Sequence, residues 1–178
     1  MSGYEYTFKL LILGDAAVGK TSLVRRFVHG KFEGKYLMTI GMEPYSRYSE
    51  INNTKVVYSI FDIAGEEKFK VMRKMFFQGA VATIIVFDLT RRSSFENAKN
   101  WYKEAITETP DQLTILIGNK SDLPDEREVT KEEGETLSNE LGSLFYIEAS
   151  ALSGDNVNTA FDKLGENLIK KASSEEFA

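Results

Sequence analysis

The sequence predicts an α/β fold: a mostly parallel sheet of six strands with one antiparallel hairpin strand and helices on both faces. Short apolar runs alternate with segments whose apolar residues recur at helical spacing, as in parallel sheets covered by helices. One early pair of runs is separated by a short turn, which indicates the hairpin. The six runs are Phe8–Leu13, Tyr45–Ile51, Lys55–Phe61, Ala82–Phe87, Leu113–Ile117 and Leu144–Ile147.

The first half of the chain predicts four strands, a helix and a turn. Phe8–Leu13 is a short apolar run that ends at a glycine and predicts a buried strand. A helix follows, with its apolar residues at helical spacing: Leu23, Val24, Phe27 and Val28. The residues 52–54, Asn-Asn-Thr, separate Tyr45–Ile51 from Lys55–Phe61 and favour a hairpin. Ala82–Phe87 is rich in β-branched residues, as central strands are.

The next segment predicts a helix and a strand. Ser93 or Ser94 can cap the helix, which has one apolar face. That face carries Phe95, Ala98, Trp101, Tyr102, Ala105 and Ile106. The run Leu113–Ile117 then predicts a buried strand.

The last third predicts two helices around one strand. Thr130 and Glu133 fit a capping box that opens a helix running towards Leu141. The run Leu144–Ile147 predicts the last strand. Asp155 is the expected cap of a final helix whose apolar residues are Val157, Phe161, Leu164 and Leu168.

Composition points to one globular domain. The chain has 178 residues, a length that favours one domain over two, so we expect residues 1–178 to form a single domain. With 42% hydrophobic and 28% charged residues it can build a core, which excludes an intrinsically disordered chain. The net charge of −5 gives no support for nucleic-acid binding. Because cysteine is absent, a disulfide scaffold, a thiolate metal site and a cysteine nucleophile are excluded.

The loop after the first strand carries the strongest motif. Residues 14–21, Gly-Asp-Ala-Ala-Val-Gly-Lys-Thr, fit G-x-x-x-x-G-K-[ST] between a strand and a helix, the context that the motif requires. Its glycines let the backbone wrap an anion, and the helix N-terminus points at that anion. Lys20 adds a positive charge for the β- and γ-phosphates, and the Thr21 hydroxyl suits Mg²⁺. The predicted phosphate contacts come from Asp15, Ala16, Ala17, Val18, Gly19, Lys20, Thr21 and Ser22.

Three further loops follow strands of the predicted sheet, where ligands of such sheets bind. In 62–65, Asp-Ile-Ala-Gly, the carboxylate of Asp62 can hold Mg²⁺ through water, and the N–H of Gly65 can approach a γ-phosphate. In 119–122, Asn-Lys-Ser-Asp, the carboxylate of Asp122 can accept from both N1–H and the exocyclic amine of guanine. Adenine lacks that pair of donors and would leave the buried charge unpaired.

The remaining residues of these loops support the base. Asn119 can brace its loop, and the stem of Lys120 can lie along the base. The loop 149–152 can offer a backbone N–H to the guanine carbonyl, from Ser150, Ala151 or Leu152. Together the loops predict a site for a guanine nucleotide.

These four loops, in this order, resemble those of the small GTPases of the Ras superfamily, and within it the Rab family is most similar. The resemblance extends from Phe8 to about Lys171. The segment 39–43 is similar to T-I-G-x-[DE] of Rab switch I, 76–80 to Y-Y-R-G-A, and 86–90 to V-Y-D-[IV]-T. The resemblance implies the G domain of the P-loop NTPases.

It also implies a function: a GTP/GDP switch that hydrolyses GTP slowly with Mg²⁺ and, in its GTP state, recruits effectors in vesicle or membrane trafficking. Thr39 would cap Mg²⁺, with Thr21 and Asp62 as the other metal-binding residues. Phe32 would stack on the base edge and Tyr36 would close over the phosphates. The catalytic residues would be Lys20, Gly65, Thr39 and Glu66. We expect a monomer whose effectors, exchange factor and GTPase-activating protein bind at 32–43 and 62–78.

One residue departs from the family pattern. The motif D-T-A-G-Q-E-[RK]-F reads Asp-Ile-Ala-Gly-Glu-Glu-Lys-Phe at 62–69, so Glu66 replaces the glutamine that orients the attacking water. A carboxylate is a better base than an amide but cannot donate to the developing charge, so the sign of the rate change stays open. The alternatives are a GTP-bound interaction module that scarcely hydrolyses and a P-loop ATPase or kinase. Asp122 argues against the ATPase or kinase.

The C-terminus departs as well. Rab proteins usually end in a flexible segment with prenylated cysteines, whereas residues 1–178 contain no cysteine. Either the chain continues beyond Ala178 or it lacks the usual lipid anchor. We expect 172–178 to form a flexible tail and the protein to be cytoplasmic, with peripheral membrane association if a lipidated tail follows.

Overall fold

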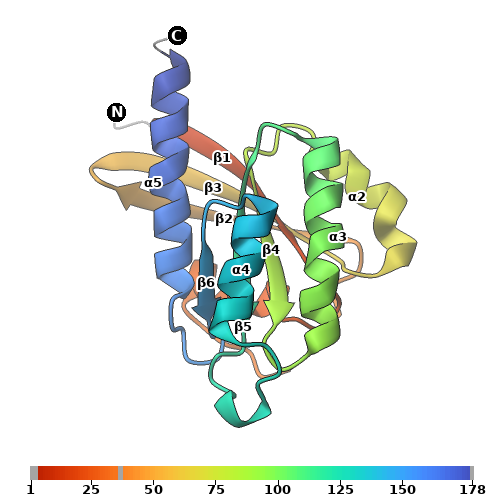
Figure 1. The fold of residues 1–178 in the computed structure, drawn as a ribbon. Coiled ribbons are helices and arrows are strands. Elements are labelled where there is room, and N and C mark those ends of the chain that lie inside the picture. Colours follow the sequence, from red (N-terminus) through yellow and green to blue (C-terminus); the bar gives the residue numbers. More distant parts are fainter. Residues whose placement is uncertain (1–3, 36–37, 177–178) are drawn as a thin grey trace.

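The computed structural model describes residues 4–35 and 38–176, and within them a six-stranded sheet is covered by helices (Figure 1). The strand order is β2-β3-β1-β4-β5-β6, and the β2–β3 pair is antiparallel while the other four pairs are parallel. The predicted fold class is therefore confirmed. The strands are β1 (Tyr6–Leu13), β2 (Met42–Ile51), β3 (Thr54–Ile63), β4 (Ala82–Asp88), β5 (Leu113–Asn119) and β6 (Tyr146–Ala149).

Five α-helices and two short 3-10 helices occur in the described part of the chain. The α-helices are α1 (Lys20–His29), α2 (Lys70–Phe77), α3 (Arg92–Glu108), α4 (Lys131–Leu141) and α5 (Val157–Glu176). The 3-10 helices are η1 (Glu67–Phe69) and η2 (Pro124–Glu126). α2 lies beside α3, away from α5 (Figure 1).

The core has two halves because successive side chains of a strand point to opposite faces of the sheet. On β1, Leu10 and Ile12 pack with Phe27 of α1 and Phe161 of α5. Leu11 and Leu13, which point to the other face of the sheet, belong to the second cluster, which includes residues of α2, α3 and α4. Buried apolar side chains on both faces explain why the central strands read as continuous apolar runs.

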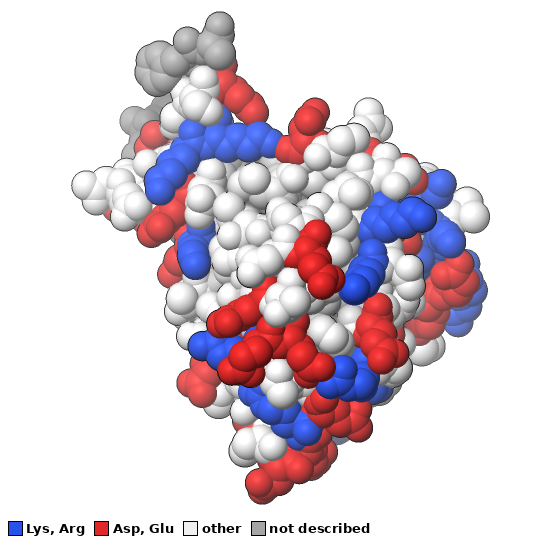
Figure 2. Space-filling view, viewed as in Figure 1, with Lys and Arg blue, Asp and Glu red and all other residues white. Residues whose placement is uncertain are grey.

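Charged side chains are interspersed on the face that Figure 2 shows. Acidic residues gather over α4 and the segment below it, where α4 has Glu132 and Glu133 in its first turn and η2 has Asp125 and Glu126. Basic side chains lie between and above them. This mixed face agrees with the modest negative net charge of the chain.

Several element ends differ from the sequence-based expectation. α3 begins at Arg92, and the prediction of a Ser93 or Ser94 cap is wrong. Ser94 is buried inside the helix, where its hydroxyl accepts from the backbone N–H of Asp88 at 2.9 Å and donates to the oxygen of Arg91 at 2.7 Å. The serine therefore closes the end of β4. The elements expected from the sequence do not include α2, although Val71, Met72, Met75 and Phe76 recur there at helical spacing.

Two other shifts occur near the C-terminus. β6 begins at Tyr146, two residues later than predicted, because Leu144 still belongs to the approach to the sheet and is 39% exposed. α5 begins at Val157, two residues after the expected cap Asp155. The same helix runs to Glu176, so most of the predicted tail at 172–178 is helical; residues 177–178 lie outside the described residues.

The capping box of α4 is confirmed. The hydroxyl of Thr130 accepts from the backbone N–H of Glu133 at 3.2 Å, and the carboxylate of Glu133 accepts from the N–H of Thr130 at 2.9 Å. The same carboxylate pairs with Arg92 of α3 at 2.8 Å. The bond from Arg92, followed by that from Thr130, lowers the pKa of Glu133 from 4.5 to about 2. Glu133 therefore joins the starts of two helices.

We predict that Glu133→Gln lowers the free energy of unfolding at neutral pH and that this difference shrinks in acid. Because the pKa of Glu133 is lowered on folding, its contribution is complete above 4.5 and is lost as the pH falls towards about 2. Urea denaturation of both proteins at neutral pH and near pH ~3 would measure it. Glu132→Gln, one residue away and outside the capping box, is the control. An equal difference at both pH values would contradict the prediction.

Candidate functional site

The loops with the predicted motifs meet at the carboxyl ends of the parallel strands. β1 has β3 on one side and β4 on the other, so the loop after β1 lies where the sheet changes winding direction. A cavity of about 60 Å³ there is lined by Ala16, Ala17, Gly19, Lys20, Thr21, Ser22, Thr39, Gly65 and Glu66, among others. A cavity of about 310 Å³ is lined by Ala17, Gly19, Ser22, Phe32, Asn119, Lys120, Asp122, Ala151 and Leu152, among others. The shared residues make the two cavities one elongated site.

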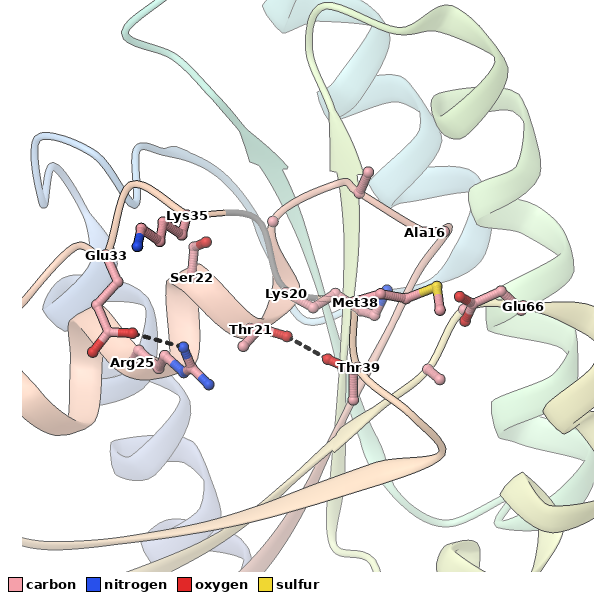
Figure 3. A pocket seen from close by; sticks show the side chains of 14 residues that line it. Ala16, Lys20, Thr21, Ser22, Arg25, Glu33, Lys35, Met38, Thr39 and Glu66 are labelled. Atoms are coloured by element: carbon pink, nitrogen blue, oxygen red, sulfur yellow. Dashed lines mark hydrogen bonds and ion pairs between the residues drawn. The ribbon is translucent and has the colours of Figure 1, made fainter.

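The smaller cavity, the phosphate end, is built around Lys20 (Figure 3). Lys20 is the first residue of α1 and only 6% exposed, and its Nζ donates to the backbone oxygens of Gly14 and Asp15 at 2.8 Å each. Burial lowers the pKa of Lys20 to about 8, while neighbouring carboxylates, with Asp62 foremost, oppose the shift. The cation lies inside the loop, where an anion wrapped by the backbone would meet it.

Two glycines allow the loops to approach this closely. Gly19 has φ +96°, and a Cβ on it would lie 2.3 Å from Nδ2 of Asn119. Gly65 belongs to another loop, and a Cβ there would lie 2.4 Å from the oxygen of Gly14 and 2.6 Å from the nitrogen of Ala16. A side chain at either position would separate the loops. Gly65 is therefore in backbone contact with the phosphate loop.

Three oxygen-bearing side chains converge beside Lys20. The hydroxyls of Thr21 and Thr39 lie 2.8 Å apart, and both contact Oδ2 of Asp62, that of Thr39 at 3.2 Å. Asp62 is fully buried, and its Oδ1 has no hydrogen-bond partner among the described residues. Burial raises the pKa of Asp62, against the bonds from Thr21 and the charge of Lys20. A buried carboxylate oxygen without a partner, beside two hydroxyls, fits a hard divalent cation such as Mg²⁺.

The larger cavity, the base end, is organised by Asn119. Its Nδ2 donates to the oxygen of Val18 at 2.9 Å, and its Oδ1 accepts from the N–H of Ala151 at 3.3 Å. Asn119 is 2% exposed. Its side-chain bonds thus brace the phosphate loop and the loop after β6.

Two further polar residues of that loop, Lys120 and Asp122, are held as well. The hydroxyl of Ser150 donates to Oδ1 of Asp122 at 2.6 Å, which orients the carboxylate that lines the base end. Lys120 forms an ion pair with the buried Asp88 at the end of β4. Of the loop 149–152, the N–H groups of Ser150 and Ala151 already have acceptors inside the protein.

Residues of the segment after α1 line both ends. Phe32 is 38% exposed beside the base end, and Thr39 lies in the phosphate end. Glu33 pairs with Arg25 of α1 at 2.9 Å, which ties this segment to the helix (Figure 3). Tyr36, the residue expected to close over the phosphates, lies outside the described residues.

Glu66 lines the phosphate end, with Met38 lying across the space between Glu66 and Thr39 (Figure 3). Its charge is close enough to raise the pKa of Lys20. The residue that departs from the family motif is therefore part of the cavity wall. A ligand in this cavity would meet a carboxylate at that position.

The sequence did not reveal how α3 holds the phosphate loop. The carboxylate of Asp15 accepts from Nδ2 of Asn97 at 2.5 Å and from Nε1 of Trp101 at 2.7 Å. Arg91 donates to the oxygen of Ala16 at 2.7 Å. Asp15 therefore offers the site only its backbone. Its partners are about eighty residues away in sequence, so no local motif could have indicated them.

The loop after β6 is held in a similar way. Arg26 of α1 donates through Nε to the oxygen of Ala151 at 2.9 Å and through Nη2 to the oxygen of Leu152. These bonds fix the backbone of a loop whose Leu152 side chain is 51% exposed. The helix that begins at the phosphate loop thus also supports the base end.

Comparisons with known proteins agree with this geometry. A profile of the Ras family matches residues 9–170. The chain is 39% identical to "Ras-related protein Rab-2B" of Dictyostelium discoideum over 97% of this chain and 86% of that protein. It is 41% identical to RABA5b of Arabidopsis thaliana over 96% of this chain and 79% of that protein. It is 38% identical to Rab-8B of Bos taurus over 94% and 81%.

We predict that Asn119→Ala lowers the free energy of unfolding by about 1–3 kcal/mol, the cost of leaving buried backbone groups without partners. The groups concerned are the oxygen of Val18 and the N–H of Ala151. Urea denaturation without added ligand would measure the loss. Asn139→Ala, at an exposed position on α4, is the matched control. A loss no larger than that of the control would show that Asn119 does not brace the loops.

Proposed function

This chain belongs to the Ras family of small GTPases and is Rab-like, and we propose that it is a molecular switch that alternates between GTP and GDP states. Membership implies guanine-nucleotide binding and GTPase activity in general. The observation that carries the proposal is the single elongated cavity. A buried lysine and hard oxygens lie at one end, and the Asp122 carboxylate lies at the other. A guanine nucleoside triphosphate has the complementary groups at both ends.

At the phosphate end the chain would position the phosphates and Mg²⁺, and would form no covalent bond with the substrate. Lys20 and the backbone N–H groups of the phosphate loop would hold the β- and γ-phosphates. Thr21, Thr39 and Asp62 would hold Mg²⁺, which supplies positive charge to the phosphates when bound. Unassisted hydrolysis by the sister protein Ras runs on the order of 10⁻⁴ per second, and we expect a similarly slow rate here.

At the base end, Asp122 would select guanine. Its carboxylate would accept from N1–H and the exocyclic amine, and the hydrogen bond from Ser150 supports that orientation. Adenine would leave this carboxylate unpaired in the cavity, at a cost of several-fold to a hundredfold in affinity. This is the reason to prefer a GTPase over an ATPase or kinase.

Glu66 supports a second candidate, a GTP-bound interaction module with little hydrolysis. As part of the cavity wall, its carboxylate would face the γ-phosphate region. There it could accept a proton from the attacking water but could not donate to the phosphoryl oxygens. At ~4 Å and an effective dielectric near 20, repulsion per unit charge is about 4 kcal/mol, which Lys20 and Mg²⁺ would partly offset.

Effectors and regulators would bind the segments 32–43 and 62–78, from which Glu33, Lys35, Met38, Thr39, Ala64, Gly65 and Glu66 line the phosphate end. Both expose large apolar side chains: Ile40 is 78% exposed, Val71 81% and Met75 75%. Such side chains suit protein partners. Because its relatives are Rab proteins, we propose that the switch acts in vesicle trafficking. None of the helices within 4–35 and 38–176 is long and apolar enough to cross a bilayer.

We predict that Asp122→Asn weakens GTP binding at least about tenfold, because a charge-assisted pair worth about 1.5–3 kcal/mol is lost. Xanthine nucleotides, which present a carbonyl in place of the amine, should gain relative to guanine. Titration with fluorescent nucleotides would measure both, with ATP as a competitor. Asp125→Asn in η2 is the control. Unchanged GTP affinity, or displacement by ATP, would contradict guanine selection by Asp122.

We predict that wild-type protein hydrolyses GTP measurably but responds poorly to a Rab-type GTPase-activating protein. Lys20 and the phosphate loop are intact, whereas the carboxylate of Glu66 disturbs the place that such a partner completes. Glu66→Gln should restore the acceleration, with Glu132→Gln on α4, outside 32–43 and 62–78, as control. Single-turnover assays of the Mg²⁺-loaded protein would measure the rates. No GDP formed over many hours would favour the non-hydrolysing module.

A further inference from the structure

Arg73 is a buried cation that the proposed function does not use. It lies on α2 and is 1% exposed, although α2 otherwise shows Val71 and Met75 to solvent. Its guanidinium pairs with Glu104 of α3, with Nε–Oε1 at 2.9 Å and Nη2–Oε2 at 3.3 Å. A two-point pair of this kind sets both distance and orientation. The fork is therefore held firmly between two helices.

The third nitrogen of the fork reaches the loop that follows β3. Nη1 of Arg73 donates to the backbone oxygens of Glu66 at 2.9 Å and Ala64 at 3.3 Å. These carbonyls flank Gly65, whose backbone touches the phosphate loop. The side chain of Arg73 therefore holds the backbone of residues 64–66, which the proposed function puts beside the γ-phosphate.

Trp101 of α3 contacts Arg73 and also holds the phosphate loop. The guanidinium lies over the ring of Trp101, 4.6 Å from its centre, and Nε1 of Trp101 donates to Asp15 at 2.7 Å. The backbone oxygen of Asp15 in turn accepts from Lys20. One turn of α3 thus supports two segments of the phosphate end. Trp101 bonds to the phosphate loop, and Glu104 holds Arg73, which bonds to the backbone of 64–66.

We propose that Arg73 is a positioning residue for GTP hydrolysis, which fixes the backbone of 64–66 against the phosphate loop from its mount on α3. The inference rests on the proposed function, since it assigns those residues to the γ-phosphate. GDP has no γ-phosphate, so its binding does not depend on this loop. Loss of Arg73 should therefore separate hydrolysis from GDP affinity, which a merely structural role would not do.

The test compares Arg73→Gln and Glu104→Gln with Lys74→Gln. Lys74 forms the neighbouring α2–α3 ion pair, with Glu108 at 3.1 Å, and has an exposed side chain, so it controls for loss of an ion pair between the same helices. In Arg73→Gln we expect single-turnover GTP hydrolysis to fall about tenfold or more. GDP affinity should stay within about twofold of wild type, a smaller change than losing one hydrogen bond to a nucleotide would cause.

Two further readouts do not depend on hydrolysis. Amide exchange at 64–67 should be faster in Arg73→Gln and Glu104→Gln than in wild type or Lys74→Gln. Trp101 is the sole tryptophan, so its emission reports the contact with Arg73 directly. In the same nucleotide state, the emission of Trp101 should differ from wild type in Arg73→Gln and match wild type in Lys74→Gln.

Each outcome decides the proposal. Wild-type hydrolysis and exchange in both Arg73→Gln and Glu104→Gln would overturn it. A parallel loss of GDP affinity and hydrolysis would overturn it too, in favour of a structural role. If Arg73→Gln does not fold, the isosteric Glu104→Gln decides by the same measurements. Wild-type protein that binds no guanine nucleotide would refute the proposed function instead, and amide exchange at 64–67 would still decide the role of Arg73.

Discussion

The amide of Asn119 is the contact on which both ends of the site depend. It joins the oxygen of Val18 to the N–H of Ala151, and so couples three loops that follow three different strands. This contact requires glycine at position 19, because a Cβ there would lie 2.3 Å from the amide nitrogen of Asn119. A glycine in the phosphate motif thus serves the base end as well. The distance between phosphate and base contacts is set by packing of loops, with little freedom left for a ligand to change it.

Much of the fold, and the meeting of the motif-bearing loops at one edge of the sheet, could be predicted from the sequence for a physical reason. Parallel strands end at one edge, so motifs that follow successive strands must meet there. The phosphate loop, Asp62, Asn119 and Asp122 are each next to a strand end, and their positions in the structure follow from that rule. The element ends were less predictable. Serine is a common helix-capping residue, yet the hydroxyl of Ser94 accepts from the N–H of Asp88 at the end of β4 and donates to the oxygen of Arg91.

The supports behind the site could not be predicted in the same way. Asp15 reads as a phosphate-loop residue, but its carboxylate bonds to α3 across more than eighty residues. Arg73 lies on a helix that the expected elements did not include, and its side chain is buried. Both cases depend on where α2 and α3 pack, and packing distances are absent from sequence spacing. Burying a charge on a helix requires its partners to be placed first, and Glu104 and Trp101 supply them.

These supports also act on the backbone of Glu66, the residue that departs from the family motif. Arg73 bonds to the backbone oxygen of residue 66 and leaves its side chain free. The bond from Arg73 to this backbone oxygen can form with either an amide or a carboxylate side chain at residue 66. The substitution then acts through charge and hydrogen-bond donation alone, beside a lysine whose buried ammonium gains from the extra carboxylate. On the proposed function, Arg73 positions the backbone at residue 66, while the Glu66 side chain sets the charge and hydrogen-bonding groups there.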